Sequence, residues 1–473
     1  MHTEDDRSPE QSSDPEDATG RGPGRRRLNE IIEFAAIVLF LAAATLFAIF
    51  TPPGAAPDEA GHAVYARAVS HGVMPTPAPV TETTLRGGRA VYNSAQAHHP
   101  PLWYAIVGGI HALTGHHDGL LTPIGRILNI LTGLAALLLV RAAMHRAFPR
   151  RPLAIAAGLM IAVASPTFTF VMGSFNNDPL AVLAVCASIY LAVRALQSPR
   201  PMRWLLALGV VLGAGLLAKL TAAVIAAPLL AAGIGVARRR KPGAWKRAAW
   251  GTAAAIGIAA AMIAPWLVRN YLMVGAATFN CAPRSGLFGS MAEVIWQPAA
   301  TLLASGLGLE EIIAGLWWPD WLLREHHTLI ADIFVGGGVG PDTRPAWLLL
   351  LPLAIGAVGL AGVARQMREM DHLEPGLTQR HVLWMMIAIP VIAMLGILHQ
   401  SFLVDGHILR WAGRYVPVMI PSIGMVIALG MSELLSQRGR GALPMLVTVA
   451  AVGLNSWAVF RVMRLYEHWT PGP

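Results

Sequence analysis

The sequence predicts an all-α polytopic membrane protein with about eleven spanning helices, and three observations lead to this prediction. Of the 473 residues, 55% are hydrophobic and only 13% are charged, whereas about a quarter of the residues in a soluble domain are charged. The apolar residues also fall into runs of about 15–21 residues, most of which reach the roughly 17–25 residues of a helix that crosses a bilayer. Basic clusters separate these runs in the alternation that the positive-inside rule describes.

The formal net charge of +9 raises the question of a nucleic-acid partner. The Lys and Arg residues, however, lie between apolar runs and do not form a basic face interleaved with aromatic residues. We therefore expect no nucleic acid, and we expect membrane lipids around the protein. Cys186 lies within an apolar run and Cys281 in a predicted loop, so the two cysteines make a poor disulfide pair.

Residues 1–27 are predicted to form a disordered cytoplasmic tail, because they are rich in charged residues, Ser, Pro and Gly and have almost no apolar content. The tail ends in Arg25-Arg26-Arg27, directly before the first apolar run, and these arginines should hold the N-terminus in the cytoplasm. A cleaved signal peptide is the alternative, but the apolar run exceeds the core of such a peptide, which has about 7–15 residues. We expect a retained first span and a multi-pass protein of the cytoplasmic (plasma) membrane.

The first predicted outer loop, residues 52–120, is too long and too polar to be a simple connection between helices. The next apolar run, 121–141, ends among arginines and should therefore pass from the outside to the inside. The apolar stretch 100–115 would break this alternation if it spanned, and it is shorter than the minimum of about 17 residues for a spanning helix. We expect it to lie in the membrane interface, with a second interfacial helix that begins at Pro57 and stops near Gly72.

The remaining apolar runs continue the alternation, and two of them form a tight hairpin with Lys219 at its outer tip. A second outer region, residues 269–345, contains a further interfacial segment, 302–323, because acidic residues interrupt it and each would be costly inside a bilayer. The transmembrane domain covers residues 28–465, and a short tail, 466–473, would lie outside. The predicted spans are 31–51, 121–141, 153–173, 180–194, 204–218, 220–236, 250–268, 347–363, 382–398, 415–429 and 443–462.

The stretch Pro-Asp-Glu-Ala-Gly-His, which begins at Pro57, is the feature of the first loop that points to chemistry. Asp58 and Glu59 are predicted in the first turn of the interfacial helix, where free backbone N–H groups and the helix dipole favour negative charge. One interpretation is that they only cap this helix. The other is that both are catalytic, because acid, base and aromatic groups of the same loop can converge on them. These groups are His62 one turn later, Tyr65, Arg67, His98 and His99.

The histidines of the first loop also raise the question of a metal site. A zinc site is disfavoured, because the spacing gives no HExxH motif and adjacent His pairs cannot easily direct two rings at one ion. A divalent cation held by Asp58 and Asp178 is the better alternative, but the sequence offers only two or three of the about six oxygen ligands that such an ion needs. No cofactor is predicted with certainty, and the metal question stays open.

The first loop resembles the first outer loop of the GT-C glycosyltransferases, which include the protein O-mannosyltransferases and the aminoarabinose transferase of lipid A. The resemblance rests on Pro57-Asp58-Glu59 with His62, Tyr65 and Gly72, and on the run His-Pro-Pro-Leu-Trp-Tyr that starts at His99. Weaker matches elsewhere extend it over most of the chain. They are Asn177-Asp178, Lys219-Leu220-Thr221, the run from Trp266 to Tyr271, and Gly413-Arg414-Tyr415.

The resemblance implies transfer of a sugar from a polyprenyl-phosphate donor to a glycan, lipid or protein acceptor at the outer face of the membrane. It also implies that Asp58 is the base that takes the proton of the acceptor. Independently of the resemblance, displacement of a phosphate from a sugar needs positive charge beside the leaving group. The cations predicted at the outer ends of spans are Lys219, Arg269, Arg410 and Arg414. Snorkelling toward lipid headgroups is the alternative for each of them.

A polytopic transporter or a flippase for lipid-linked sugars is the competing class of function. Transporters usually place ionisable groups near the middle of the membrane and have paired, interrupted helices. In this sequence the predicted spans are nearly free of acidic residues, and charged residues gather at the outer ends and in the loops. The sequence therefore favours an enzyme.

Overall fold

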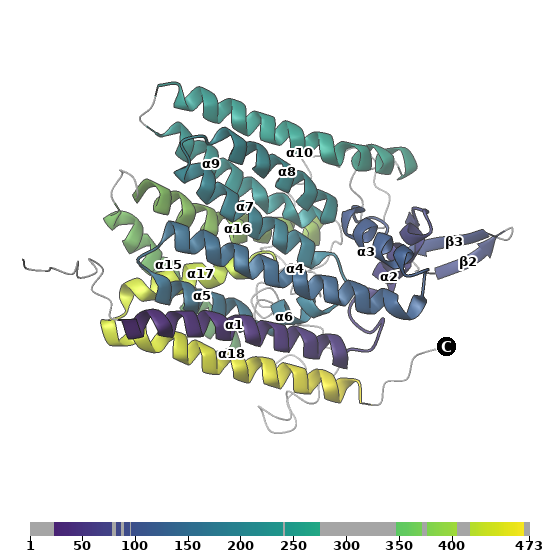
Figure 1. The fold of residues 1–473 in the computed structure, drawn as a ribbon, viewed down its shortest axis with the longest axis horizontal. Coiled ribbons are helices and arrows are strands. Elements are labelled where there is room, and N and C mark those ends of the chain that lie inside the picture. Colours follow the sequence, from purple (N-terminus) through teal and green to yellow (C-terminus); the bar gives the residue numbers. More distant parts are fainter. Residues whose placement is uncertain are drawn as a thin grey trace, which may run out of the picture.

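The computed structural model describes residues 23–77, 82–86, 89–94, 96–239, 242–274, 347–370, 376–403 and 417–467. Most of them belong to long helices that run side by side, and a few short elements gather at one end of this bundle (Figure 1). The predicted helical membrane-protein class is confirmed. Several predictions fall outside the described residues: most of the N-terminal tail, the segment 302–323, Arg410 and Arg414.

Each predicted span coincides with helical structure. The elements at these spans are α1 (Pro23–Phe50), α4 (Asp118–Ala147), α5 (Pro152–Val163), α6 (Pro166–Gly173), α7 (Asp178–Gln197), α8 (Met202–Ala218), η1 (Leu220–Ile225), α9 (Ala226–Ala237), α10 (Ala244–Val274), α15 (Trp347–Glu369), α16 (Gly376–Leu403), α17 (Ile420–Leu434) and α18 (Gln437–Leu465). Within the described residues, 7 helices are long and apolar enough to cross a membrane, or 8 if α5 and α6 form one span. The count of about eleven therefore stays a prediction.

The predicted span 153–173 is a bent pair of helices and not a straight one. The helices α5 and α6 meet at 66°, because Pro166 lacks an N–H group and the residue before a proline avoids helical geometry. Ser165 caps the new helix by accepting a hydrogen bond from the Phe168 N–H group at 3.3 Å. Asn455 of α18 supports the break, since its amide donates to the Val163 carbonyl at 2.8 Å and accepts from the Thr169 hydroxyl at 2.7 Å.

The first loop contains both interfacial helices that the sequence predicts, α2 (Glu59–Ser70) and α3 (Leu102–Leu113). It also contains a three-stranded sheet, which the all-α prediction missed. Its strands are β1 (Thr76–Pro77), β2 (Glu82–Arg86) and β3 (Arg89–Ser94), in the order β1-β3-β2. The antiparallel strands β2 and β3 pair from Glu82 with Asn93 to Arg86 with Arg89.

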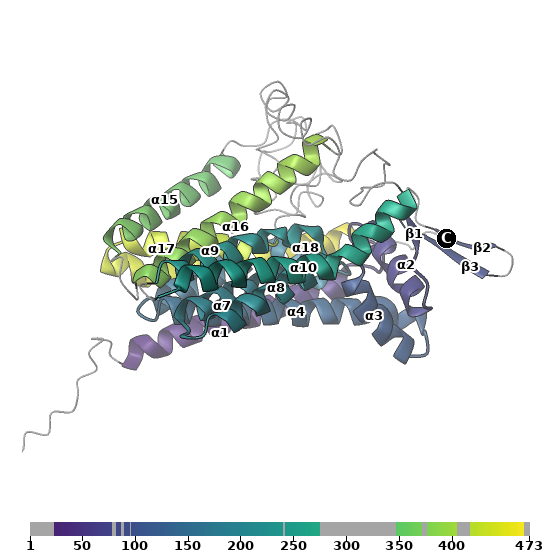
Figure 2. The same cartoon turned by 90° about the horizontal axis from the view of Figure 1, so that it is seen from above.

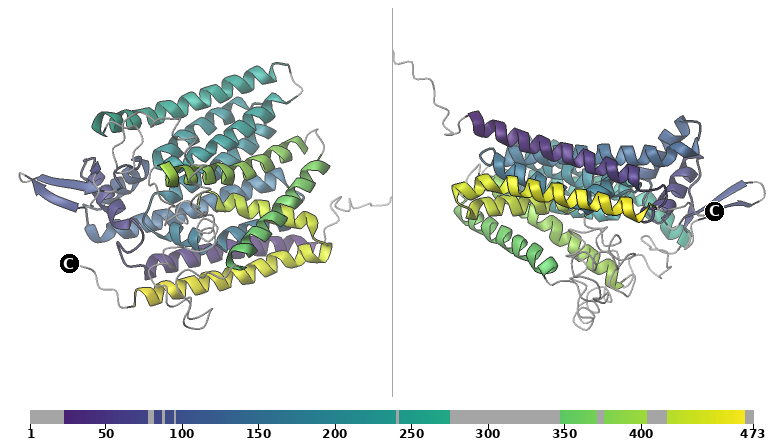
Figure 3. Two further views of the ribbon diagram at one scale, coloured as in Figure 1. Left: turned by 180° about the vertical axis from the view of Figure 1, so that it is seen from behind. Right: turned by 90° about the horizontal axis from the view of Figure 1, so that it is seen from below.

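The two ends of the bundle differ. The start of α1 and the turns between α4 and α5 and between α17 and α18 lie at one end, and the first loop lies at the other (Figures 2 and 3). The end of α18 is at the first-loop end, because the Tyr466 hydroxyl donates to the Ala55 carbonyl at 3.1 Å. The predicted alternation of spans also puts the end of the last span and the first loop on the same side of the membrane.

Candidate functional site

A buried ion pair anchors the start of α2. Glu59 is 0% exposed and Arg126 of α4 is 5% exposed, and the guanidinium donates to both carboxylate oxygens at 2.9 and 2.7 Å. Arg126 also donates to the carbonyls of Ala48, Thr51 and Pro52. These hydrogen bonds tie the end of α1 and the chain that follows it to the first turns of α4, and the pair with Glu59 is bidentate.

Glu59 accepts two further hydrogen bonds, from the N–H groups of Gly54 at 2.8 Å and Phe175 at 3.1 Å. Its carboxylate therefore joins the first loop, α4 and the turn between α6 and α7. The side chain is fully buried and both oxygens accept hydrogen bonds from the protein, and the catalytic role of Glu59 stays a prediction.

Asp58 differs from its neighbour. It is half-buried, it immediately precedes α2, and its backbone has φ 61° and ψ 0°. This left-handed conformation is uncommon for a residue with a side chain, although Asp tolerates it better than most. The Asp58 side chain makes no capping hydrogen bond to α2. Side-chain capping is therefore wrong for Asp58, whereas Glu59 lies in the first turn of α2 as predicted.

An aromatic cluster lies directly behind Asp58. The His62 Nδ1 atom is 2.7 Å from the Tyr104 hydroxyl, and the Tyr104 ring stacks on Tyr65 with centroids 3.7 Å apart. The His62 ring stacks on His99 at 5.7 Å, and the Tyr65 hydroxyl donates to the His99 carbonyl at 3.2 Å. The structure thus brings together His62 of α2 and His99, which precedes α3, as the sequence predicts.

The electrostatics of Tyr104 show which acidic residues share this site. Burial raises the pKa of the Tyr104 hydroxyl well above its ordinary value, and Tyr65, Asp178 and Asp58 raise it further. Asp178 begins α7, far from the first loop in sequence, yet its charge acts on the same hydroxyl as that of Asp58. The phenol therefore stays protonated and can serve His62 as a hydrogen-bond donor.

Asp178 and Lys219 form a second buried pair. The Lys219 ammonium donates to both Asp178 oxygens at 2.7 Å, and the two residues are 6% and 5% exposed. Lys219 lies between α8 and η1, at the predicted hairpin tip, and the Asn177 amide fastens that tip by donating to the Ala218 carbonyl at 2.8 Å. The sequence predicts separate ligand-binding roles for Asp178 and Lys219, whereas the structure pairs their charges with each other.

The sequence prediction missed Asn129 as well as Arg126. Asn129 is 0% exposed; its Oδ1 atom accepts from the Trp103 indole at 2.9 Å. Its amide donates to the carbonyls of Ser174 and Asn176 at 2.6 and 2.8 Å. Both residues are isolated polar positions in the N-terminal half of α4, which is an apolar run, and an ionisable group within such a run is by itself a signal of function.

Arg269 lies near the end of α10 and reaches the first loop. Its guanidinium donates to the Pro75 carbonyl at 3.4 Å and to the Asn270 side chain at 3.2 Å, and it lies 4.7 Å from the centroid of the Trp266 ring. Its positive charge also lowers the pKa of Tyr65, although burial raises that pKa by more. Within the described part of the chain, no carboxylate pairs with Arg269.

Arg67 and His98, two further residues that the sequence predicts for the site, differ in their distance from it. Arg67 forms an ion pair with Asp118 at 2.9 Å, and it lies about 13 Å from Asp58 along the helix at 1.5 Å per residue. The structure therefore does not bring Arg67 to Asp58. The half-buried His98 lies next to the cluster, with its ring centroid 4.1 Å from that of His99.

For a metal, the described residues contain no group of three or more His, Cys, Asp or Glu side chains that could hold an ion. Asp178, one of the two ligands that the sequence offers for a divalent cation, has Lys219 on both oxygens. These residues as they stand do not fit such an ion, because the ammonium occupies the positions of the metal.

Comparisons with known proteins support this reading of the fold. A family model described as dolichyl-phosphate-mannose-protein mannosyltransferase matches residues 98–268. The search of curated proteins gives no match. The fold is similar to that of the oligosaccharyltransferase of Archaeoglobus fulgidus, solved with Zn and sulfate, with a TM-score of 0.50 and 14% identity over 93% of this chain and 53% of that chain.

A second solved structure is ArnT from Cupriavidus metallidurans bound to undecaprenyl phosphate, with a TM-score of 0.36 and 18% identity over 89% of this chain and 80% of that chain. The chain spans about half the length of the oligosaccharyltransferase that it matches. The family match and the shared helical membrane fold confirm that this chain is similar to the GT-C glycosyltransferases.

Proposed function

We propose that the protein is a membrane glycosyltransferase that moves a sugar from a polyprenyl-phosphate donor to an acceptor at the side of the membrane where the first loop lies. The observation that carries this proposal is Asp58, a half-buried carboxylate in a left-handed backbone conformation beside a fully buried anchor. Unusual backbone geometry of this kind gathers at functional sites, where the surrounding structure maintains it. The match to a family whose donor is a dolichyl-phosphate sugar supports the donor class.

In the proposed reaction, Asp58 accepts the proton of the acceptor as the acceptor atom bonds to the anomeric carbon. The bond between that carbon and the phosphate oxygen breaks, and the polyprenyl phosphate leaves with the electron pair. A base of this kind must reach the acceptor, and of the two adjacent acids only Asp58 has an exposed surface. Glu59 and Arg126 hold Asp58 in place through the backbone.

Arg269 is the cation that we assign to the departing phosphate. Its guanidinium lies beside the first loop, and it has no acidic partner within the described residues. The Arg269 charge acts on the Tyr65 hydroxyl, and the Asp58 charge acts on the Tyr104 hydroxyl. Because the Tyr65 and Tyr104 rings stack on each other, Arg269 and Asp58 flank the same aromatic pair. Lys219 is neutralised by Asp178, so we assign that pair to shaping the site. Arg410 and Arg414 remain proposed phosphate ligands outside the described residues.

The experiment is a donor-consumption assay with purified protein in liposomes. Polyprenyl-phosphate sugars that differ in the sugar are supplied in turn, and released polyprenyl phosphate is measured. The proposal expects release with at least one donor for the wild type and little for Asp58→Asn, because the amide keeps the shape of the side chain but cannot accept a proton.

The control is Asp118→Asn, since Asp118 begins α4 and its side chain is 67% exposed in the ion pair with Arg67. It should keep wild-type release. If no donor is consumed but a lipid-linked sugar crosses the membrane, the protein is a flippase and the proposal is wrong.

A further inference from the structure

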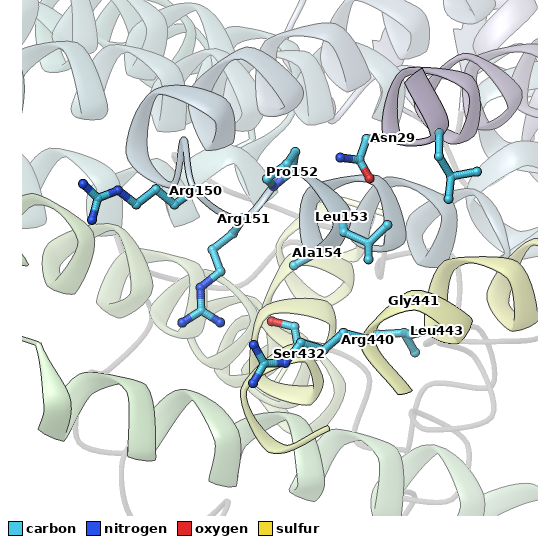
Figure 4. A pocket seen from close by; sticks show the side chains of 11 residues that line it. Asn29, Arg150, Arg151, Pro152, Leu153, Ala154, Ser432, Arg440, Gly441 and Leu443 are labelled. Carbon is cyan, nitrogen blue, oxygen red and sulfur yellow. The ribbon is translucent and has the colours of Figure 1, made fainter. Parts of the chain in front are cut away.

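Arginines lie at both ends of the bundle, and those at the end opposite the first loop interact with other groups of the protein. There, Arg150, Arg151 and Arg440 line a cavity of about 290 Å³ (Figure 4). Arg151 pairs with Glu433 at 2.6 Å, and Arg440 donates to the Leu435 carbonyl at 2.9 Å. The positive-inside rule expects arginines on the predicted cytoplasmic side, so these residues do not by themselves indicate a ligand.

Arg461 of α18, at the other end, differs from them. It lies within the last predicted span, 443–462, and it is 5% exposed. In the part of the chain that the structure describes, its buried Nε atom has no hydrogen-bond partner, and no carboxylate pairs with its guanidinium. A buried charge without a partner strongly destabilises a folded protein. An ionisable group within a span is therefore a signal of function.

The fold gives full sets of partners to another buried polar side chain of the same helix. Asn455 is 2% exposed; its amide donates to the carbonyls of Val163 and Ala451 at 2.8 and 2.9 Å, and its oxygen accepts from the Thr169 hydroxyl at 2.7 Å. Arg461 has no such set. Snorkelling toward lipid headgroups needs an exposed guanidinium, and Arg461 has almost no exposed surface. This leaves a ligand as the partner for its charge.

Arg461 lies where the first loop begins. The helix α18 packs against α1 and α6, and Val462, the next residue, belongs to a buried cluster that also contains Ala56. Ala56 lies two residues before Asp58 in the sequence. The hydrogen bond of Tyr466 ties the end of α18 to the same stretch of chain. Arg461 therefore borders the segment that carries the proposed base.

Arg461 and Arg269 belong to opposite edges of the bundle. The helix α10, which carries Arg269, lies along one edge and α18 along the other, with the first loop at the end of the bundle between them (Figures 1 and 3). In a single displacement at a sugar carbon, the acceptor attacks from the face opposite the departing group. Because we assign Arg269 to the departing phosphate, a cation for the acceptor is expected across the site from it.

We propose that Arg461 binds an oxyanion, a phosphate or a carboxylate, of the acceptor substrate. This inference rests on the proposed function and gives the class of acceptor: a molecule with an anionic group apart from the group that receives the sugar. A guanidinium suits an oxyanion because it can donate two parallel hydrogen bonds to two oxygens. A neutral glycan or lipid would leave the buried charge without a partner and should be a poor acceptor.

The test is the thermal unfolding midpoint of the full-length protein in detergent, with glycerol 3-phosphate and glycerate as anionic probes and glycerol as the neutral probe. At least one anion should raise the midpoint of the wild type, and glycerol should not. Arg461→Met should have the higher midpoint without a probe, because it removes the buried charge. Its apparent affinity for the anions should be roughly ten-fold lower or more, which corresponds to the loss of a charged hydrogen bond.

The matched control is Arg464→Gln, because Arg464 is an exposed arginine of the same helix that pairs with Glu467 at 2.7 Å. It should respond to the anions as the wild type does. No anion response in the wild type, or an equal response in Arg461→Met, would overturn the proposal. If Arg461→Met does not fold, Arg461→Lys replaces it: the charge stays but the two parallel bonds are lost, so wild-type affinity for the anions would overturn the proposal as well.

A second measurement separates the acceptor from the donor. Binding of a labelled polyprenyl phosphate should weaken in Arg269→Gln and keep its wild-type affinity in Arg461→Met. If Arg461→Met weakens it as much as Arg269→Gln does, Arg461 belongs to the donor site and the assignment to the acceptor is wrong. Neither measurement requires sugar transfer, so a failure of this anion site is distinguishable from a failure of Asp58 as the base.

Discussion

The buried pair of Glu59 and Arg126 offers the sharpest test of how the first loop is held. We consider Glu59→Gln, Arg126→Gln and the double variant. The single change at Glu59 keeps the shape of the side chain but leaves the Arg126 charge without its carboxylate. Removal of one partner of a buried ion pair typically costs about 3–5 kcal/mol, because the other charge stays buried. No allowance for solvent screening is needed, since the two side chains are 0% and 6% exposed.

Arg126→Gln should be at least as destabilising. It removes the donor of five hydrogen bonds, two to Glu59 and three to backbone carbonyls in the last turn of α1 and just after it. An unsatisfied buried acceptor costs about 1–3 kcal/mol. In the double variant no charge is left unpaired, so its loss should be smaller than the sum of the single losses.

The assay is reversible unfolding in mixed micelles, followed by helical circular dichroism, for the wild type and the three variants. We predict a coupling free energy of about 2 kcal/mol or more between the two positions. The folded fraction of Glu59→Gln should also lose turnover, because Asp58 is the adjacent residue. Additive losses, within about 0.5 kcal/mol, would refute the argument that this pair anchors the loop.

Three further predictions concern the same end of the bundle. Tyr104→Phe should lower the unfolding midpoint and reduce turnover, because it removes the hydroxyl that lies 2.7 Å from the buried His62 Nδ1 atom. An unchanged midpoint and unchanged turnover would contradict a role for this hydrogen bond. Burial lowers the pKa of His111 in the folded protein. Near the ordinary histidine pKa of about 6.5 the unfolded chain therefore binds more protons than the folded one, so the free energy of unfolding should rise with pH and decrease as the pH falls. Thermal midpoints at several pH values should therefore depend less on pH in His111→Gln than in the wild type, and an identical dependence would contradict this. In a chain without Cys186 and Cys281, an impermeant thiol reagent applied to intact cells should label Gly88→Cys and not Gly243→Cys; the reverse result would place the first loop inside.

The sequence predicts the helical segments well, because each span is a long apolar run and needs no knowledge of its neighbours. The same reasoning finds α2 and α3, which are too short to cross a bilayer. It misses the sheet at 76–94, although β2 and β3 flank a Gly-Gly pair. Two strands of five and six residues give little periodic signal.

The site is predicted only in part, because its interactions join distant segments. Asp58, His62 and His99 are found from one loop, and Asp178 and Lys219 from two others, but nothing local shows that Asp178 and Lys219 pair with each other. Arg126 pairs with Glu59, which lies 67 residues earlier in the chain. Asn129 bridges Trp103 to carbonyls that lie 45 and 47 residues later. An isolated Arg or Asn in a span can be noticed from the sequence, whereas its partner has to come from the structure.

The central claim is that Asp58 accepts a proton in the transfer step, and a single-turnover experiment tests it most directly. Donor affinity and the rate of sugar transfer are measured separately for the wild type and Asp58→Asn, with enzyme in excess over labelled polyprenyl-phosphate sugar. A general base is worth about 10²–10⁴ in rate, so the account predicts a loss of that size in the transfer rate with donor affinity nearly unchanged. A transfer rate in Asp58→Asn equal to that of the wild type would contradict it.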